Sequence, residues 1–322
     1  MIDGSELVGQ ILGWPEDDPD AVERARSRLG DAIAAEKRRR DRRRRLFLPA
    51  AATIAIGVAT AVVVALVGPI GGSTAAAAAE LRRFGTIASS AEGPKLGEGQ
   101  YLLVDSEELR PETRTEIGGA SSFTVVSRLR LQTWIATDGS SFRRTEWVSS
   151  EFASDADRRS WEEAGKPNVP HAGDVLEERF PSGEDLLVDL SGVSREPDDL
   201  LTDLRSGSIV PRSPGDDQVF LLIGELLAQG DAAPEVRAAL FEAAALLEGI
   251  EEVGPVTDPL ERDGIALALD GTSIRTQLVF DPETADLFSI ELYPIRTDGS
   301  VGGLSSWRAF RPAIVVDSSP GP

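Results

Sequence analysis

Residues 122–137 read SFTVVSRLRLQTWIAT, and this alternating stretch decides the fold class that the sequence predicts. Apolar side chains such as Leu129 and Leu131 point to one face of a strand, whereas the residues between them point to the other. The Asp-Gly dipeptide that follows is typical of a tight hairpin turn, and residues 141–148 form the expected return strand. The stretch therefore predicts an antiparallel β-hairpin.

Strand patterns and helix patterns continue on both sides of this hairpin. Further strands are expected at residues 100–105, 265–269, 274–280 and 288–292, with an edge strand at 307–315 that a proline weakens. Helices are expected at residues 74–91, 197–205, 217–228 and 234–248, the last two as an αα-hairpin. Residues 149–182 are charged and are expected to be irregular. This order predicts an α+β domain in which helices cover one face of an antiparallel sheet.

A long apolar segment precedes this domain. Residues 46–67 contain no charged side chain, and 22 residues of helix span roughly 33 Å, enough to cross a bilayer core. Eight basic residues lie between Lys37 and Arg45, immediately before the segment. The positive-inside rule therefore predicts a cytoplasmic segment at 1–45, a transmembrane helix at 46–70 and an extracytoplasmic domain at 71–322.

The same segment has two other interpretations besides a membrane anchor. A cleaved signal peptide would need an N-terminal region of 45 residues and an apolar run longer than the usual 7–15. A nucleic-acid-binding arm would explain the basic residues, but a run that directly adjoins an apolar span is more simply a topology determinant. The anchor is therefore the preferred prediction.

Composition limits what the remainder can do. The chain has a formal net charge of −21, and residues 1–45 carry 11 basic and 10 acidic side chains, so the rest carries −22. An acidic exterior argues against direct nucleic-acid binding. The chain has no Cys and a single His171, which excludes thiol chemistry and zinc sites built on Cys or paired His. His171 lies in a proline-rich stretch and is expected in a loop. We predict no catalytic, cofactor-binding or metal-binding residue.

The predicted cytoplasmic segment contains one amphipathic pattern. Val22, Leu29 and Ile33 recur at helical spacing and form one apolar stripe. A partner-binding helix would use these three residues, whereas the alternative is a solvated helix next to the membrane.

Several segments together carry a resemblance to a known family. They are AAAAAELRRFG at 75–85, GQYLLV at 99–104, PDDLLTDLR at 197–205, PEVRAALFEAAALLEGIEEVG at 234–254 and TQLVFDPETADLFSIEL at 276–292. In this order, after a basic flank and a single span, they resemble an uncharacterised actinobacterial family of single-pass membrane proteins encoded near extracytoplasmic-function sigma factors. The outer domain is similar in layout to the lipoprotein-carrier and RseB-type periplasmic fold. The resemblance implies a curved sheet covered by helices and a signalling role, and it carries over no site residue.

The sequence leaves three functional hypotheses. The first is a membrane-anchored binding or sensor protein that regulates an envelope-stress sigma factor through its cytoplasmic segment. The alternative is an anchored carrier of lipid or lipoprotein that acts only outside the membrane. The third, an envelope enzyme, would use acidic pairs, but such adjacent pairs are usually solvated, so we expect no enzyme. The pairs are Asp198/Asp199, Asp216/Asp217 and Glu251/Glu252.

Overall fold

The computed structural model describes residues 74–318, except 116–121, 183–187, 189, 191, 208 and 210–214. The predicted cytoplasmic segment at 1–45, with Val22, Leu29 and Ile33, and the predicted span at 46–70 lie outside the described residues. Among the helices that are described, none is both long and apolar enough to cross a membrane.

A single antiparallel sheet organises the described part of the chain and confirms the α+β class. Its strands lie in the order β4-β3-β2-β1-β9-β8-β7-β6-β5, and β10 also pairs with β1. The strands are β1 (Tyr101–Thr115), β2 (Ser122–Ala136), β3 (Ser141–Phe152), β4 (Val175–Phe180), β5 (Glu251–Thr257), β6 (Asp263–Asp270), β7 (Ile274–Phe280), β8 (Leu287–Pro294), β9 (Ser306–Phe310) and β10 (Ile314–Val316).

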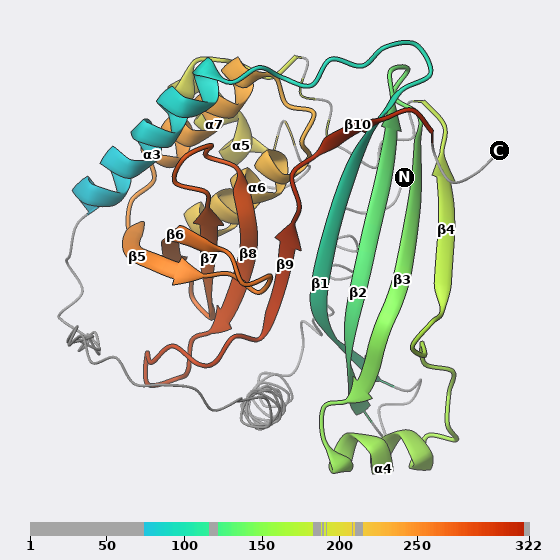
Figure 1. The fold of residues 1–322 in the computed structure, drawn as a ribbon. Helices are drawn as coiled ribbons and strands as arrows, with labels where there is room; N and C mark the ends of the chain where they lie inside the picture. Colours follow the sequence, from blue (N-terminus) through green and yellow to red (C-terminus); the bar gives the residue numbers. More distant parts are fainter. Residues whose placement is uncertain are drawn as a thin grey trace, which may run out of the picture.

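The helices divide the sheet into two halves (Figure 1). Four of them pack beside β5–β8, and we call this the helix-covered half; they are α3 (Thr74–Ser90), α5 (Pro197–Ser206), α6 (Asp216–Ala228) and α7 (Pro234–Ala244). We call β1–β4 the hairpin half. It carries α4 (Asp155–Glu163) at one end, against β2 and β3. Strand β9 joins the halves by pairing with both β1 and β8.

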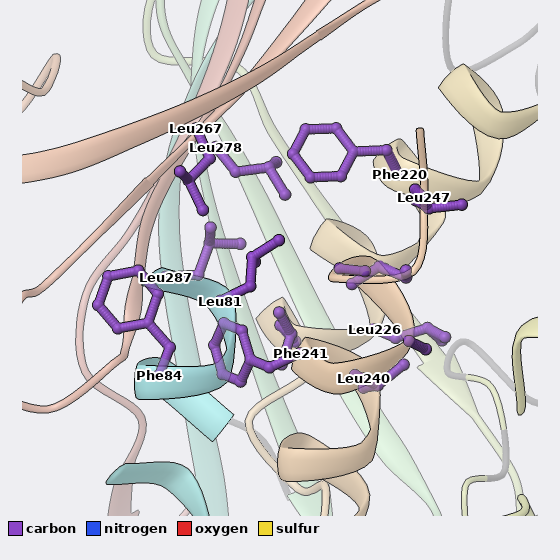
Figure 2. Packing of buried hydrophobic residues seen from close by; sticks show 14 of the residues in the cluster. Leu81, Phe84, Phe220, Leu226, Leu240, Phe241, Leu247, Leu267, Leu278 and Leu287 are labelled. Carbon is purple, nitrogen blue, oxygen red and sulfur yellow. The ribbon is translucent and has the colours of Figure 1, made fainter. Parts of the chain in front are cut away.

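The main hydrophobic core lies between the four helices and the helix-covered half (Figure 2). Its centre is a triangle of rings in which the Phe84 centroid lies 5.7 Å from that of Phe241 and 5.1 Å from that of Phe280. The Phe241 and Phe280 centroids are 5.4 Å apart, so α3, α7 and β7 meet at one point. These distances are typical of favourable tilted ring pairs.

A second, smaller core lies at the α4 end of the hairpin half. It contains Phe123 and Val125 from β2, with Phe152 and Trp161 packed against them. Helix α4 begins after Ser154, whose hydroxyl accepts a hydrogen bond from a backbone N–H in the first turn. The prediction that residues 149–182 are irregular was therefore wrong, since the end of β3, α4 and β4 all lie within this stretch. A nine-residue helix with few apolar residues gives only a weak periodic signal.

Three strand predictions also need correction. The stretch 307–315 was expected at an edge, but β9 is internal; the proline at 312 falls between β9 and β10, where no ladder hydrogen bond is lost. Strand β5 was not predicted, because its sequence EEVGPVT contains both Gly and Pro. Strand β1 ends ten residues after its predicted end. Its Pro111 lies beyond Leu109, the last β1 residue that pairs with β9.

Candidate ligand pocket beneath strand β5

A pocket of about 250 Å³ opens on the face of the helix-covered half that is turned away from the helices. Leu278 and Ile290 point from β7 and β8 into the helical core, so their neighbours Gln277 and Glu291 point to the opposite face. The lining residues come from β5, β7, β8 and the loop after β8: Val253, Val256, Thr257, Arg275, Gln277, Glu291, Tyr293 and Val301.

The pocket exists because the sheet curls strongly at this edge. Strand β6 lies between β5 and β7 in the sheet, yet side chains of β5 and β8 line one pocket. The β5–β6 pairing shifts register between Glu252 and Gly254, and Gly254 has a φ of 91° that favours glycine. This bulge bends β5 over the sheet face.

Two of the lining residues, Gln277 and Glu291, belong to one row of side chains that crosses the strands. Ala268 on β6 pairs with Gln277, Gln277 pairs with Glu291 on β8, and Glu291 pairs with Trp307 on β9. The polar side chains of Gln277 and Glu291 therefore lie between the small Ala268 and the large ring of Trp307. Both polar residues are buried, Gln277 with 7% and Glu291 with 4% of its surface exposed.

Glu291 is the chemically distinctive group of the pocket. Its Oε1 accepts a hydrogen bond from the Ser289 hydroxyl (2.9 Å), and its Oε2 accepts bonds from Gln277 Nε2 (2.9 Å) and the Tyr293 hydroxyl (2.6 Å). Among the described residues, no Lys or Arg forms an ion pair with it. Burial raises the pKa of Glu291, the negative charge of Asp258 raises it further, and the three hydrogen bonds only partly oppose this.

The other charged groups around the pocket are already paired. Arg275 Nη1 lies 2.9 Å from Asp270, and its Nη2 lies 3.0 Å from Glu251. Burial and the nearby carboxylate of Glu291 raise the pKa of the Tyr293 hydroxyl, so it remains a hydrogen-bond donor at physiological pH. The guanidinium in the wall is therefore neutralised by two carboxylates, whereas no cation of the described residues lies against Glu291.

A buried ion pair holds the turn that follows β5. The Asp258 side chain is fully buried and lies 2.5 Å from Arg262 Nη2. Arg262 also donates to the backbone carbonyls of Phe310 (2.7 Å) and Phe288 (2.9 Å), and its guanidinium lies 4.0 Å from the Phe288 ring centroid. The turn is thereby tied to β8 and β9, which fixes the position of β5 above the pocket.

The same face continues into the hairpin half as a network of paired charges. Arg130 lies 2.6 Å from Asp105, and Arg128 lies 2.5 Å from Glu107. Arg311 joins them, at 3.3 Å from Asp105 and 2.6 Å from Glu107. Burial raises the pKa of Glu107, but hydrogen bonds from Arg311 and Arg128 outweigh it, so the pKa lies below its ordinary value. We therefore interpret this network as structural.

The structure brings together none of the acidic pairs that the sequence suggested for catalysis. Asp198/Asp199 lie in the first turn of α5, Asp216/Asp217 in the first turn of α6 and Glu251/Glu252 at the start of β5. His171 lies in an exposed loop, as predicted, and its backbone N–H donates to Asp174. The predicted partner-binding residues lie outside the described part.

Sequence reasoning did not identify Glu291, Gln277 or Tyr293. A signal was present, because the β8 sequence LFSIELYP places Ser289, Glu291 and Tyr293 at every second position of an otherwise apolar strand. Alternation alone assigns such residues to a solvated face. The curl of β5, which buries that face, depends on contacts distant in sequence.

No family model matches the sequence, and no curated protein matches it either. Within the described residues, no group of three or more His, Asp or Glu side chains is arranged to hold a metal ion. The candidate site is a small pocket whose buried carboxyl group accepts three side-chain hydrogen bonds but forms no ion pair with any described residue.

Proposed function

We propose that the chain is a single-pass membrane protein whose extracytoplasmic domain binds a ligand and regulates an envelope-stress sigma factor. The observation that carries this proposal is the pocket beneath β5, which combines a buried carboxyl group with an apolar mouth. The first described element of the same domain is α3, which begins at Thr74. The apolar run at 46–67, with basic residues only on its N-terminal side, supports the topology.

The topology can be tested with single cysteines, because the chain has none of its own. Thr137→Cys places a thiol in an exposed turn of the extracytoplasmic domain, and Ser5→Cys places one near the N-terminus. A membrane-impermeant maleimide should label Thr137→Cys on intact cells and Ser5→Cys only after lysis. Labelling of both on intact cells, or recovery of the chain in the soluble fraction, would contradict the proposed anchor.

The regulatory role can be tested at the predicted apolar stripe. We expect crosslinking in native membranes to join the cytoplasmic segment to a sigma factor or another transcription regulator. The Leu29→Asp/Ile33→Asp variant should lose that partner, because charged groups do not pack in an apolar interface. A partner that is retained by this variant, or capture of envelope proteins alone, would refute signalling through residues 1–45.

A second candidate, an anchored carrier of lipid or lipoprotein, rests on a different surface. In the hairpin half, Leu131, Trp147 and Leu176 lie on neighbouring strands and point to the helix-side face. Leu176 is 45% exposed. A photoactivatable lipid incubated with the full chain in membranes should then label peptides of β2–β4. Labelling confined to residues 46–70 would favour the sensor over the carrier.

A further inference from the structure

We propose that the pocket beneath β5 binds a small aliphatic ammonium compound, with Glu291 as the counter-ion for its charged nitrogen. This inference deepens the proposed binding role and rests on it for the assumption that the pocket takes a ligand. It adds the chemical class of that ligand, which four features of the pocket define.

The first feature is charge. Even without Glu291, the carboxylates of Asp258, Glu251 and Asp270 outnumber the guanidinium groups of Arg262 and Arg275 around the pocket. Each arginine already contacts at least one carboxylate, and Arg275 contacts two. An anionic ligand would therefore meet a neutralised guanidinium and a net negative field, whereas a cation would be attracted.

The second feature is the hydrogen-bonding capacity of Glu291. An ionised carboxyl group offers about four acceptor positions. Ser289, Gln277 and Tyr293 occupy three of them, two on Oε2 and one on Oε1. One position on Oε1 remains, which suits a single N–H donor from a ligand. A charge-assisted bond of this kind is stronger than a neutral one, because it restores a positive partner to a buried carboxylate.

The third and fourth features are size and wall chemistry. A volume of about 250 Å³ equals roughly eight water molecules at about 30 Å³ each. The mouth is formed by valines, of which Val253 is 43% and Val301 is 39% exposed. A short alkyl chain fits against these side chains while its terminal nitrogen reaches Glu291. A larger ligand would not fit this volume, and a strongly polar ligand would make no favourable contact with the valine side chains.

Protonation of Glu291 links binding to pH. The groups that face it are Ser289, Gln277, Tyr293 and the charge of Asp258, with Arg275 in the same wall. Burial raises the pKa of Glu291, whereas a bound ammonium ion would stabilise the carboxylate and lower that pKa. Binding should release a proton, and affinity should fall as pH is lowered through the pKa of the free pocket.

The experiment uses the purified full chain in detergent and isothermal titration with n-butylammonium. Butanoate and butan-1-ol are the matched anionic and neutral probes. We expect butylammonium to bind, with proton release detected as a dependence of the heat on the buffer, and neither matched probe to bind as tightly. Equal or tighter binding of butanoate or butan-1-ol would overturn the proposal.

Variants localise the effect. Glu291→Gln should weaken butylammonium binding by about tenfold or more, because a charge-assisted hydrogen bond is lost. Glu283→Gln removes the same charge at an exposed turn and should leave binding unchanged. Tyr293→Phe retains the ring and should alter the pH dependence without abolishing binding. Unchanged affinity in Glu291→Gln, or equal losses in Glu291→Gln and Glu283→Gln, would overturn the assignment.

The outcomes also separate this inference from the proposed function. Binding of butylammonium in a chain that fails the cysteine-labelling test would keep the pocket assignment and remove the membrane-sensor role. Correct topology and partner capture without any butylammonium binding would keep the sensor role and remove the ammonium ligand.

Discussion

The helix-covered half and the hairpin half are built from the same antiparallel sheet but are stabilised differently. In the helix-covered half, four helices bury β6, β7 and β8 against a large apolar core. In the hairpin half, the apolar cluster at α4 is small, and one face carries cross-strand pairs between arginines and carboxylates. Burial of apolar surface contributes more per residue than partly exposed ion pairs. Stability should therefore be concentrated in the half that holds the pocket.

The largest expected effect comes from the phenylalanine triangle. Phe241→Ala should lower the free energy of unfolding by about 3–5 kcal/mol, because the side chain is fully buried and its removal leaves a cavity. Urea unfolding of the full chain, followed by tryptophan fluorescence, measures this loss. The matched variant in the hairpin half is Phe152→Ala, whose ring is only partly buried. Equal losses for the two variants would refute the proposed difference between the halves.

The next effect concerns the ion pair that fixes the turn after β5. Arg262→Ala leaves the fully buried Asp258 carboxyl group without its cation, and we expect a loss of about 3 kcal/mol. The double variant Asp258→Ala/Arg262→Ala should recover part of that loss, since the uncompensated charge is removed with its partner. A double variant that is as unstable as the sum of the two single variants would show that the pair does not couple.

The contrast between the halves also explains what the sequence predicted well. The hairpin of β2 and β3 and the helices α3, α5, α6 and α7 follow local periodicity, and their expected starts agree with the structure to within one residue. Strand β3 ends four residues later, and α7 four residues earlier, than expected. Leu129 and Leu131, for example, alternate with arginines that pair across the strands. Such patterns are local and can be read from one segment at a time.

The pocket depends on features that no single segment contains. Strand β5 carries Gly254 and Pro255, which argue against a strand, yet pairing with β6 and the ion pair of Asp258 hold it in place. Glu291 is buried in a pocket that residues of β5 also line. Tertiary context therefore overrides local propensity at the candidate site, which is why strand prediction could not identify it.

A smaller effect is expected from the charge network of the hairpin half. Glu107→Gln should lower the free energy of unfolding by about 1 kcal/mol, because Arg128 and Arg311 are about two-fifths exposed and solvent screens them. The pKa of Glu107 is lowered in the folded state, so its contribution is present above the ordinary glutamate pKa and is lost as pH falls through the lowered value. Unfolding at low and high salt checks this, because salt should reduce the difference from the unaltered chain. A salt-independent difference would point to packing instead.

The smallest effect on stability is expected at Glu291, the buried glutamate of the helix-covered half. This residue also gives the sharpest test of the difference between the halves. Burial raises the pKa of Glu291, so the folded state holds a proton that the unfolded state has released. Between the ordinary glutamate pKa and the raised one, stability must fall as pH rises, which is opposite in sign to the contribution of Glu107. Glu291→Gln keeps the shape of the side chain and removes this fall, so its stability relative to the unaltered chain should increase as pH rises between those two pKa values. Urea unfolding across that range, with Glu283→Gln as the exposed control, gives the difference directly. Parallel plots of the free energy of unfolding against pH for Glu291→Gln and the unaltered chain would show that folding does not raise the pKa of Glu291. The pocket would then differ from the charge network in shape alone.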